Sequence, residues 1–142
     1  MSQRNLEVVR RSYEAWSRGD FEAFFRSFDA DIEWHLPEGG INADIYRGHR
    51  EVRQFMESYL EAFDCFRMEP ERFFEMGDRI VVFVHSRARG KGSGVEVEVR
   101  PAHLWTMRDG KAVRFELFPE REREKALEAV GLSEQHPRAD LS

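Results

Sequence analysis

Residues 101–118 read PAHLWTMRDGKAVRFELF, and this stretch decides how the last third of the chain folds. Asp109-Gly110 separates two runs of β-forming residues. This dipeptide is a strong signal for a two-residue hairpin of type I′, because both central residues of that turn need positive φ. A tight turn there fixes the predicted register, which is Met107 opposite Ala112, Trp105 opposite Arg114, His103 opposite Glu116 and Pro101 opposite Phe118. Opposed side chains share one face of the sheet, about 4.5–5.5 Å apart at Cβ.

The predicted pair of His103 and Glu116 lies among aromatic side chains, like the polar end of an apolar pocket. An imidazole oriented by a carboxylate is suited to moving a proton near neutral pH. The alternative is a structural hydrogen bond between the two strands on a solvated face. Arg114 also has two interpretations: it anchors a carboxylate or enolate of a ligand, or it pairs with Glu116 and stacks on the Trp105 indole.

The length of 142 residues suits one domain, which we expect over residues 1–132, followed by a mobile tail over residues 133–142. The composition is biased towards aromatic residues, with 12 Phe, 3 Trp and 3 Tyr. Such side chains build cores and also line small-molecule cavities. The expected wall of a cavity for a small hydrophobic ligand consists of Trp16, Trp34, Tyr59, Trp105 and Phe118, although each is more often a core residue than a ligand contact.

Charge and motifs exclude several classes of function. The net charge is −5 and basic residues are interleaved with acidic ones, so we expect no nucleic-acid partner. No signal peptide or membrane-spanning run is present, and a single cysteine excludes an internal disulfide, which together favour a cytoplasmic protein. There is no H-x-H, H-E-x-x-H, Walker or dinucleotide motif, so we expect neither a metal site nor a cofactor.

The periodicity of apolar residues changes from helical to strand-like along the chain. It predicts helices over about 3–18 and 49–63, with a short helix between them that carries four phenylalanines from Phe21 to Phe28. Strands are predicted at 32–36, 66–76, 79–89, 94–107 and 112–118, with a loop over 37–48 and a closing helix between Pro119 and Gly131. Helices first and antiparallel strands afterwards indicate an α+β fold, in which a curved sheet wraps around the helices and leaves a cavity where the wrap is incomplete.

This order, together with particular residues, resembles the NTF2-like superfamily and, within it, the SnoaL-like branch. The matching stretches are Tyr13-Glu-Ala-Trp16, Gly19-Asp20-Phe21, Phe28-Asp-Ala-Asp31-Ile-Glu-Trp34, Tyr46-Arg-Gly48, Val52-Arg-Gln-Phe55, Gly77-Asp78 and His103-Leu-Trp105 through Asp109-Gly110-Lys111. The likeness covers about residues 3–130, and the order and spacing of the pieces carry it. It implies a cone-shaped α+β barrel of the cystatin-like type with a mixed or antiparallel sheet, a deep pocket and commonly a homodimer.

The resemblance also limits the chemistry that we expect. Where ketosteroid isomerases carry a base this chain has Trp34, and their helix-1 tyrosine falls nearest Ser12, one residue from Tyr13. Their proton-donating aspartate falls on His103. The Asp–Arg–Asp pattern of the epoxide hydrolases is also absent. The cyclase branch relies on one acid/base in the late strands, and His103 or Glu116 fits that role.

The other face of the predicted hairpin is more uniformly apolar, since it carries Ala102, Leu104, Thr106, Val113, Phe115 and Leu117. Either this face is the core and the His103 face is exposed, or a second subunit covers it. An apolar patch of that size is a liability in water, so we expect a homodimer through the sheet.

We therefore expect an enzyme that isomerises, cyclises or hydrates a largely apolar carbonyl compound by general acid/base catalysis without a cofactor. His103 is the expected acid/base, Glu116 orients it or shares its proton, and Tyr13 or Arg114 stabilises negative charge on oxygen. Two alternatives stay open: a non-catalytic protein that binds a hydrophobic ligand in the same cavity, and a dimeric interaction scaffold.

Overall fold

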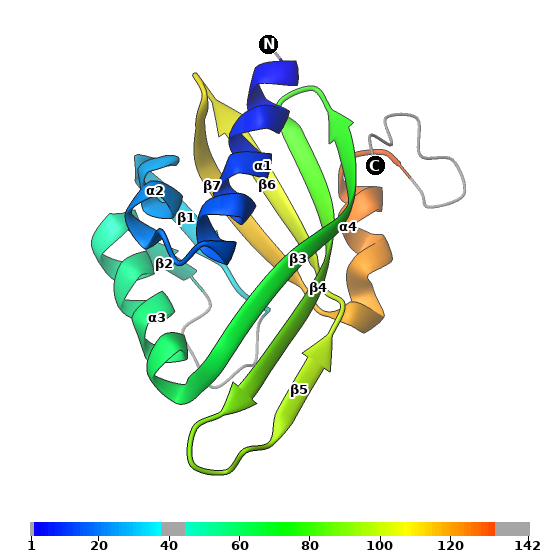
Figure 1. The fold of residues 1–142 in the computed structure, drawn as a ribbon. Helices are drawn as coiled ribbons and strands as arrows, with labels where there is room; N and C mark the ends of the chain where they lie inside the picture. Colours follow the sequence, from blue (N-terminus) through cyan, green and yellow to red (C-terminus); the bar gives the residue numbers. More distant parts are fainter. Residues whose placement is uncertain (1, 38–44, 133–142) are drawn as a thin grey trace.

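The computed structural model describes residues 2–37 and 45–132 as helices that pack on both sides of a strongly curved sheet (Figure 1). The predicted tail and most of the predicted 37–48 loop lie outside the described residues. The elements in chain order are α1 (Ser2–Ser17), α2 (Phe21–Arg26), β1 (Phe28–His35), β2 (Ile45–Arg47), α3 (Gly48–Ala62), β3 (Phe63–Met76), β4 (Arg79–Gly90), β5 (Glu96–Val99), β6 (Ala102–Arg108), β7 (Lys111–Phe118), a 3-10 helix (Glu120–Glu122) and α4 (Arg123–Ala129).

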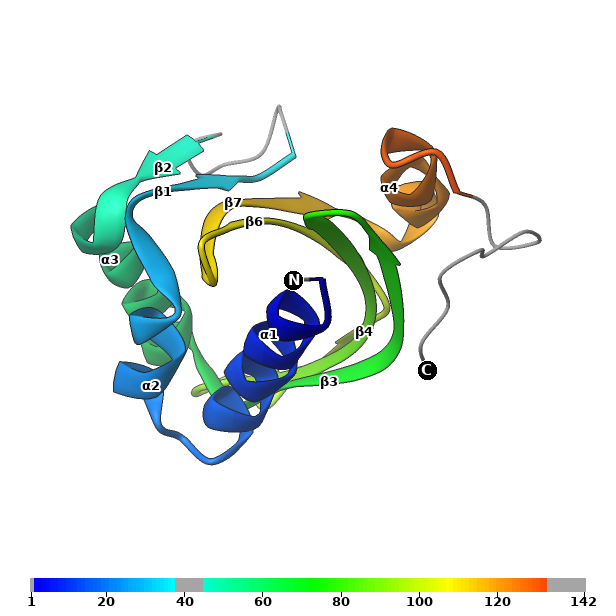
Figure 2. The ribbon, with the colours of Figure 1, turned by 90° about the horizontal axis from the view of Figure 1, so that it is seen from above.

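The seven strands of the described chain form one mixed, unclosed sheet in the order β2-β1-β7-β6-β4-β3, with β5 paired to the far end of β4. Only the β1–β7 pair among these strands is parallel. Figure 2 shows α1 lying in the hollow of the sheet, with α2 and α3 beside it and α4 on the outside. The α+β class and the curved sheet around N-terminal helices are thus confirmed.

In the hairpin between β6 and β7, the turn and the first pairs of residues match the prediction, but the register beyond them does not. Asp109 and Gly110 have φ angles of 53° and 76°, and Met107 lies opposite Ala112. The next pair is Thr106 with Arg114, so Val113 is an extra residue that forms a β-bulge on β7. Since side chains alternate along a strand, one extra residue moves all later residues of β7 to the opposite face. The predicted pairs are therefore wrong from Trp105 onwards; Phe115 lies opposite Trp105 and Leu117 opposite His103.

Three element boundaries also differ from the prediction. Phe28 begins β1 rather than ending the second helix, and the short strand β2 was not predicted. The predicted strand 94–107 is two strands, because Pro101 has no N–H group for the ladder and interrupts it. The carbonyl of Pro101 still accepts a hydrogen bond from the Val84 N–H at 3.0 Å, which keeps β5 and β6 on the same edge of β4.

The sheet separates two apolar clusters. The larger cluster lies on the concave side between the sheet, α1, α2 and α3, and includes Trp16, Phe24 and Trp34. The smaller lies on the convex side, where α4 of the same chain packs against the sheet. It contains Phe74, Val81, Phe83, Ala102, Leu104, Ala126, Leu127, Val130 and Leu132. The apolar face that led us to expect a second subunit is thus divided: α4 covers Ala102 and Leu104, while Phe115 and Leu117 turn inward with the concave cluster.

None of the described helices is long and apolar enough to cross a membrane.

Candidate functional site

A cavity of about 360 Å³ lies between the helices and the concave face of the sheet. Its walls are predominantly apolar and aromatic, and include Phe24, Leu36, Phe55, Met56, Phe63 and Phe66. α1 and α3 supply one side of the cavity, and β4, β6 and β7 supply the other. A hollow of this size, with few polar groups in an apolar wall, is the usual form of a small-molecule site.

The polar end of the cavity is a chain of three buried side chains from α1 and β6. The Trp105 indole Nε1 donates a hydrogen bond to the Tyr13 hydroxyl oxygen at 2.9 Å, and that oxygen lies 2.7 Å from Nδ1 of His103. Trp105 and His103 are two residues apart on β6, so both point to the concave face. The helical spacing of Leu6, Val9 and Tyr13 directs Tyr13 from α1 onto that face.

The hydrogen-bond pattern favours one of the two tautomers of His103. An indole N–H can only donate, so the Tyr13 oxygen accepts from Trp105. Among the described residues, Nδ1 of His103 is the acceptor available to the Tyr13 proton, because no other described residue accepts a hydrogen bond from this hydroxyl. This arrangement favours the tautomer of His103 with its proton on Nε2. No described residue hydrogen-bonds Nε2, which leaves this N–H as the group that His103 offers to a bound molecule.

Burial keeps both titratable members of this chain neutral. His103 is 5 % exposed, and desolvation lowers its pKa to about 3. Desolvation also raises the pKa of Tyr13 well above its ordinary value, an effect that the hydrogen bond from Trp105 reduces only in part. The site thus presents a neutral imidazole donor and a neutral phenol across the physiological pH range.

Three of the residues predicted for the cavity wall, Trp34, Tyr59 and Trp105, line the cavity. Trp34 stacks on Phe115 with ring centroids 3.8 Å apart, so the floor of the cavity is a layered aromatic surface. Trp16 does not line the cavity: it packs against Phe21, Phe24 and Phe66 in the core and donates its indole proton to the Phe66 carbonyl. Phe118 also lies elsewhere, because the bulge at Val113 turns it towards the convex cluster.

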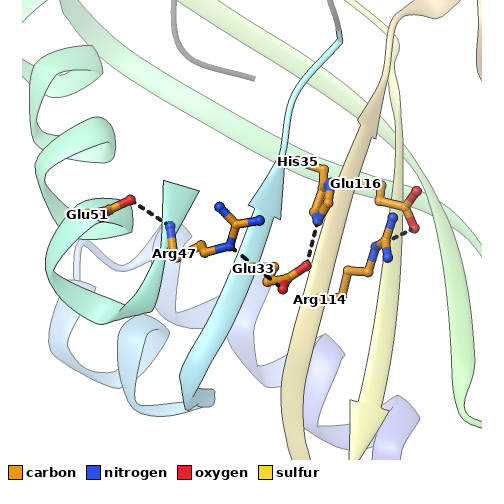
Figure 3. Close-up of polar contacts among 6 residues, drawn as sticks. All are labelled: Glu33, His35, Arg47, Glu51, Arg114 and Glu116. Carbon is orange, nitrogen blue, oxygen red and sulfur yellow. Dashed lines mark hydrogen bonds and ion pairs between the residues drawn. The ribbon is translucent and has the colours of Figure 1, made fainter. Parts of the chain in front are cut away.

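Glu116 and Arg114 lie on the outside of the sheet, so the predicted pairing of Glu116 with His103 is wrong. Arg114 Nε is 3.3 Å from Glu116 Oε2, in a patch that also holds Glu33, His35 and Arg47 from β1 and β2 (Figure 3). The parallel pairing of β1 with β7 places Glu33 beside Arg114 and His35 beside Glu116. A hydrogen bond between His35 and Glu33 holds the pKa of Glu33 below its ordinary value. The structural interpretation of Arg114, an ion pair with Glu116, agrees with this placement, whereas its stacking on Trp105 does not.

Comparison with known proteins assigns the family. A model of the SnoaL-like domain matches residues 9–115, which is most of the chain. The chain belongs to the SnoaL-like family. Its solved neighbours include TerC, crystallised with polyporic acid, which is 29 % identical with a TM-score of 0.74 and covers 89 % of this chain and 97 % of that one. An NTF2-like protein of unknown function from Burkholderia pseudomallei is 31 % identical, with a TM-score of 0.75 and coverage of 89 % and 98 %.

Mycobacteria contain proteins of similar sequence. An uncharacterized protein of Mycobacterium tuberculosis is 28 % identical over 115 residues, which are 80 % of this chain and 87 % of that protein. The fold and the family therefore agree with the resemblance seen in the sequence.

Two features of this SnoaL-like site were not predicted. The first is the contact between Tyr13 and His103, which joins residues 90 positions apart and depends on how α1 lies in the sheet. The second is the presence of Phe115 and Leu117 in the cavity wall, which follows from the bulge. For the first feature, one indication was present in the sequence, which is the helical spacing that places Tyr13 on the inner face of the first helix. For the second feature, there was none. Within the described residues, no group of three His, Cys, Asp or Glu side chains is placed to hold a metal ion.

Proposed function

We propose that this SnoaL-like protein binds a largely apolar carbonyl compound and polarises its carbonyl oxygen through the Nε2–H group of His103, without a cofactor. The observation that carries the proposal is the chain from Trp105 through Tyr13 to His103 at the polar end of an aromatic cavity. TerC, a neighbour with 29 % identity, was crystallised with polyporic acid, which supports a small-molecule ligand for this cavity as well.

The role of His103 follows from its protonation state. With Nδ1 accepting from Tyr13, the Nε2–H group is a donor, and we assign it as an electrophile rather than as the general acid/base expected from the sequence. When a nucleophile adds to a carbonyl carbon, or when an enolate forms, negative charge develops on the oxygen. A fixed donor in an apolar site stabilises that charge more than it stabilises the neutral ketone. Cyclisation, hydration and isomerisation of a carbonyl compound all benefit from stabilisation of this negative charge.

Tyr13 supports this role indirectly, because its hydroxyl occupies Nδ1 and fixes the tautomer. Proton transfer from Tyr13 would leave a buried phenolate, which its raised pKa disfavours. His103 thus stabilises an oxyanion without passing on a proton. Arg114 and Glu116 have no part in the proposed site, since both lie on the outer face.

A non-catalytic binding protein is the second candidate, and one observation favours it. Among the described residues that line the cavity, the only carboxylate is Glu120, which is exposed at the mouth. Isomerisation needs a base beside the acidic carbon. A cavity without one is suited to holding a carbonyl compound without converting it.

The test compares wild type with His103→Asn, which removes the Nε2–H donor and leaves a side-chain oxygen as an acceptor for Tyr13. With uncharged aromatic ketones as probes, we expect the infrared carbonyl frequency of a bound ketone to shift downward in wild type only. The dissociation constant should rise about five- to tenfold, the loss of one hydrogen bond. Ser86→Ala is the matched control, because it removes a polar group from another part of the cavity wall and leaves His103 intact. An equal carbonyl frequency in wild type and His103→Asn would refute the assignment of His103.

Turnover of ketones, enones and epoxides then separates the two candidates. Conversion by wild type that is lost in His103→Asn while ligand still binds supports the enzyme. Tight binding with a shifted carbonyl frequency and no conversion supports the binding protein. The homodimer and the cytoplasmic location expected from the sequence stay predictions, and the mass of the purified protein in solution tests the first.

A further inference from the structure

Strand β5 leaves apolar side chains half exposed at the mouth of the cavity. Val97 and Val99 are each 42 % exposed, and both line the cavity. They lie opposite Ala88 and Ser86 of β4, which line it too. Figure 1 shows β5 and the end of β4 extending beyond the rest of the sheet. Apolar side chains left in water beside a cavity commonly mark a surface that a ligand covers.

The distance along β4 shows that the cavity is elongated. His103 lies opposite Val82 of β4, and Val97 lies opposite Ala88, six residues further along the same strand. A strand rises about 3.3 Å per residue, so roughly 20 Å of strand separates the two ends. Side chains at even positions share one face of β4, and Val84 and Ser86 occupy that face between the ends. One end of the cavity offers the His103 donor, and the other offers only apolar contacts.

The charge of the wall limits which ligands fit. None of the described residues that line the cavity is a lysine or an arginine. Glu120 is the only charged residue among them, and its carboxylate accepts a hydrogen bond from the Arg100 backbone N–H at 2.7 Å. An anion in the cavity would lose its hydration without meeting a cation, which is strongly unfavourable.

We propose that the cavity selects an uncharged, elongated ligand, with a carbonyl group at His103 and an apolar far end that covers Val97 and Val99 of β5. The assignment of the carbonyl end rests on the proposed function of His103. The assignment of the far end rests on the exposure of the two valines and their continuity with the cavity.

The test uses three ketones of increasing length: acetophenone, 4-acetylbiphenyl and 4-acetyl-p-terphenyl. Their dissociation constants are measured for wild type and for a Val97→Ser, Val99→Ser double variant. We expect affinity to rise with each ring in wild type, and the double variant to lose about five- to tenfold for the longest ketone and less than twofold for acetophenone. Val95→Ser is the matched control, because Val95 is 61 % exposed beside the same strand but does not line the cavity.

A second arm tests charge. Biphenyl-4-carboxylate has nearly the shape of 4-acetylbiphenyl, and wild type should bind it at least about tenfold more weakly because its charge is not compensated. Equal affinity for the ketone and the carboxylate would overturn the preference for uncharged ligands.

Other outcomes separate this inference from the proposed function. If the double valine variant loses equal affinity for short and long ketones, the subsite on β5 is refuted. The same holds if the affinity of wild type does not rise with ketone length. Both results count against the subsite even if His103→Asn still abolishes the carbonyl shift. A length dependence that the valine variants remove supports the subsite even if His103→Asn changes nothing. If the valine variants change the mass of the protein in solution instead of ligand affinity, a second copy of the chain covers β5 and the subsite is refuted. Failure of all three ketones to bind refutes both proposals.

Discussion

At the scale of single residues, one phenol oxygen organises the polar end of the cavity. The Tyr13 hydroxyl satisfies the Trp105 indole and Nδ1 of His103 at once, and all three side chains are buried. Tyr13→Phe keeps the ring but leaves two buried polar groups without a partner. We expect the free energy of unfolding to fall by about 1–3 kcal/mol, measured by urea denaturation. Tyr59→Phe, at a half-buried position in the same wall, should have a smaller effect, and equal losses for the two variants would contradict this view of Tyr13.

His103 makes the stability of the protein depend on pH. Its pKa falls from 6.5 to about 3 on folding because burial disfavours the charged imidazole. Between these values the unfolded chain binds a proton at His103 that the folded chain does not bind. Stability therefore rises with pH, and it is lost as the pH falls from 6.5 towards 3, by about 1.4 kcal/mol per pH unit.

The measurement is urea denaturation of wild type and His103→Asn at several pH values between 4 and 7. Both proteins share their carboxylates, so the difference between their free energies of unfolding isolates the imidazole. Wild type should lose stability relative to the variant as the pH falls. Two curves that stay parallel over this range would show that His103 titrates alike in the folded and unfolded states.

At the scale of elements, the bulge at Val113 decides which side chains enter the cavity. Deleting Val113 would restore the regular register, turning Arg114 and Glu116 inward and Phe115 and Leu117 outward. Since two charges would then enter an apolar interior, we expect the deletion to abolish cooperative unfolding, followed by circular dichroism on heating. Deleting Gly92 from the exposed β4–β5 loop is the control and should leave a folded protein, because such loops tolerate changes in length. A Val113 deletion with wild-type melting behaviour would refute this role of the bulge.

The same bulge explains where prediction from the sequence ended. The Asp109-Gly110 turn, the first and third helices and the approximate positions of most strands along the chain follow from local turn chemistry and periodicity, which is why they were predicted. Nothing local marks the bulge, since Val113 is a good strand former in an unbroken run. The bulge lies beside a contact between distant parts of the chain: Ala112 donates its N–H to the Ser27 carbonyl at 2.9 Å, where β1 joins β7, and β1 is itself irregular between Phe28 and Glu33. A prediction from the hairpin alone therefore paired His103 with the wrong residue.

At the scale of the whole molecule, the chain covers both faces of its own sheet. The concave face holds the cavity, and α4 seals the convex face with Ala126 and Leu127, both fully buried. From the sequence alone, we expected the apolar side of the hairpin to be one surface that a partner subunit covers. The part played by α4 was not predictable in this way, because the amphipathic spacing of a short helix does not indicate which face of a sheet the helix packs against.

This arrangement predicts that stability and ligand binding respond separately to changes on the two faces. Leu127→Ala removes a fully buried side chain from the convex cluster and should lower the free energy of unfolding by about 2–5 kcal/mol. The sheet backbone lies between this cluster and the cavity, so affinity for 4-acetylbiphenyl should change less than twofold under conditions where the variant is folded. Glu128→Ala, at an exposed position of the same helix, is the control for both measurements. A loss of ligand affinity in Leu127→Ala that matches the loss in His103→Asn would show that the curvature of the sheet, and with it the cavity, depends on α4.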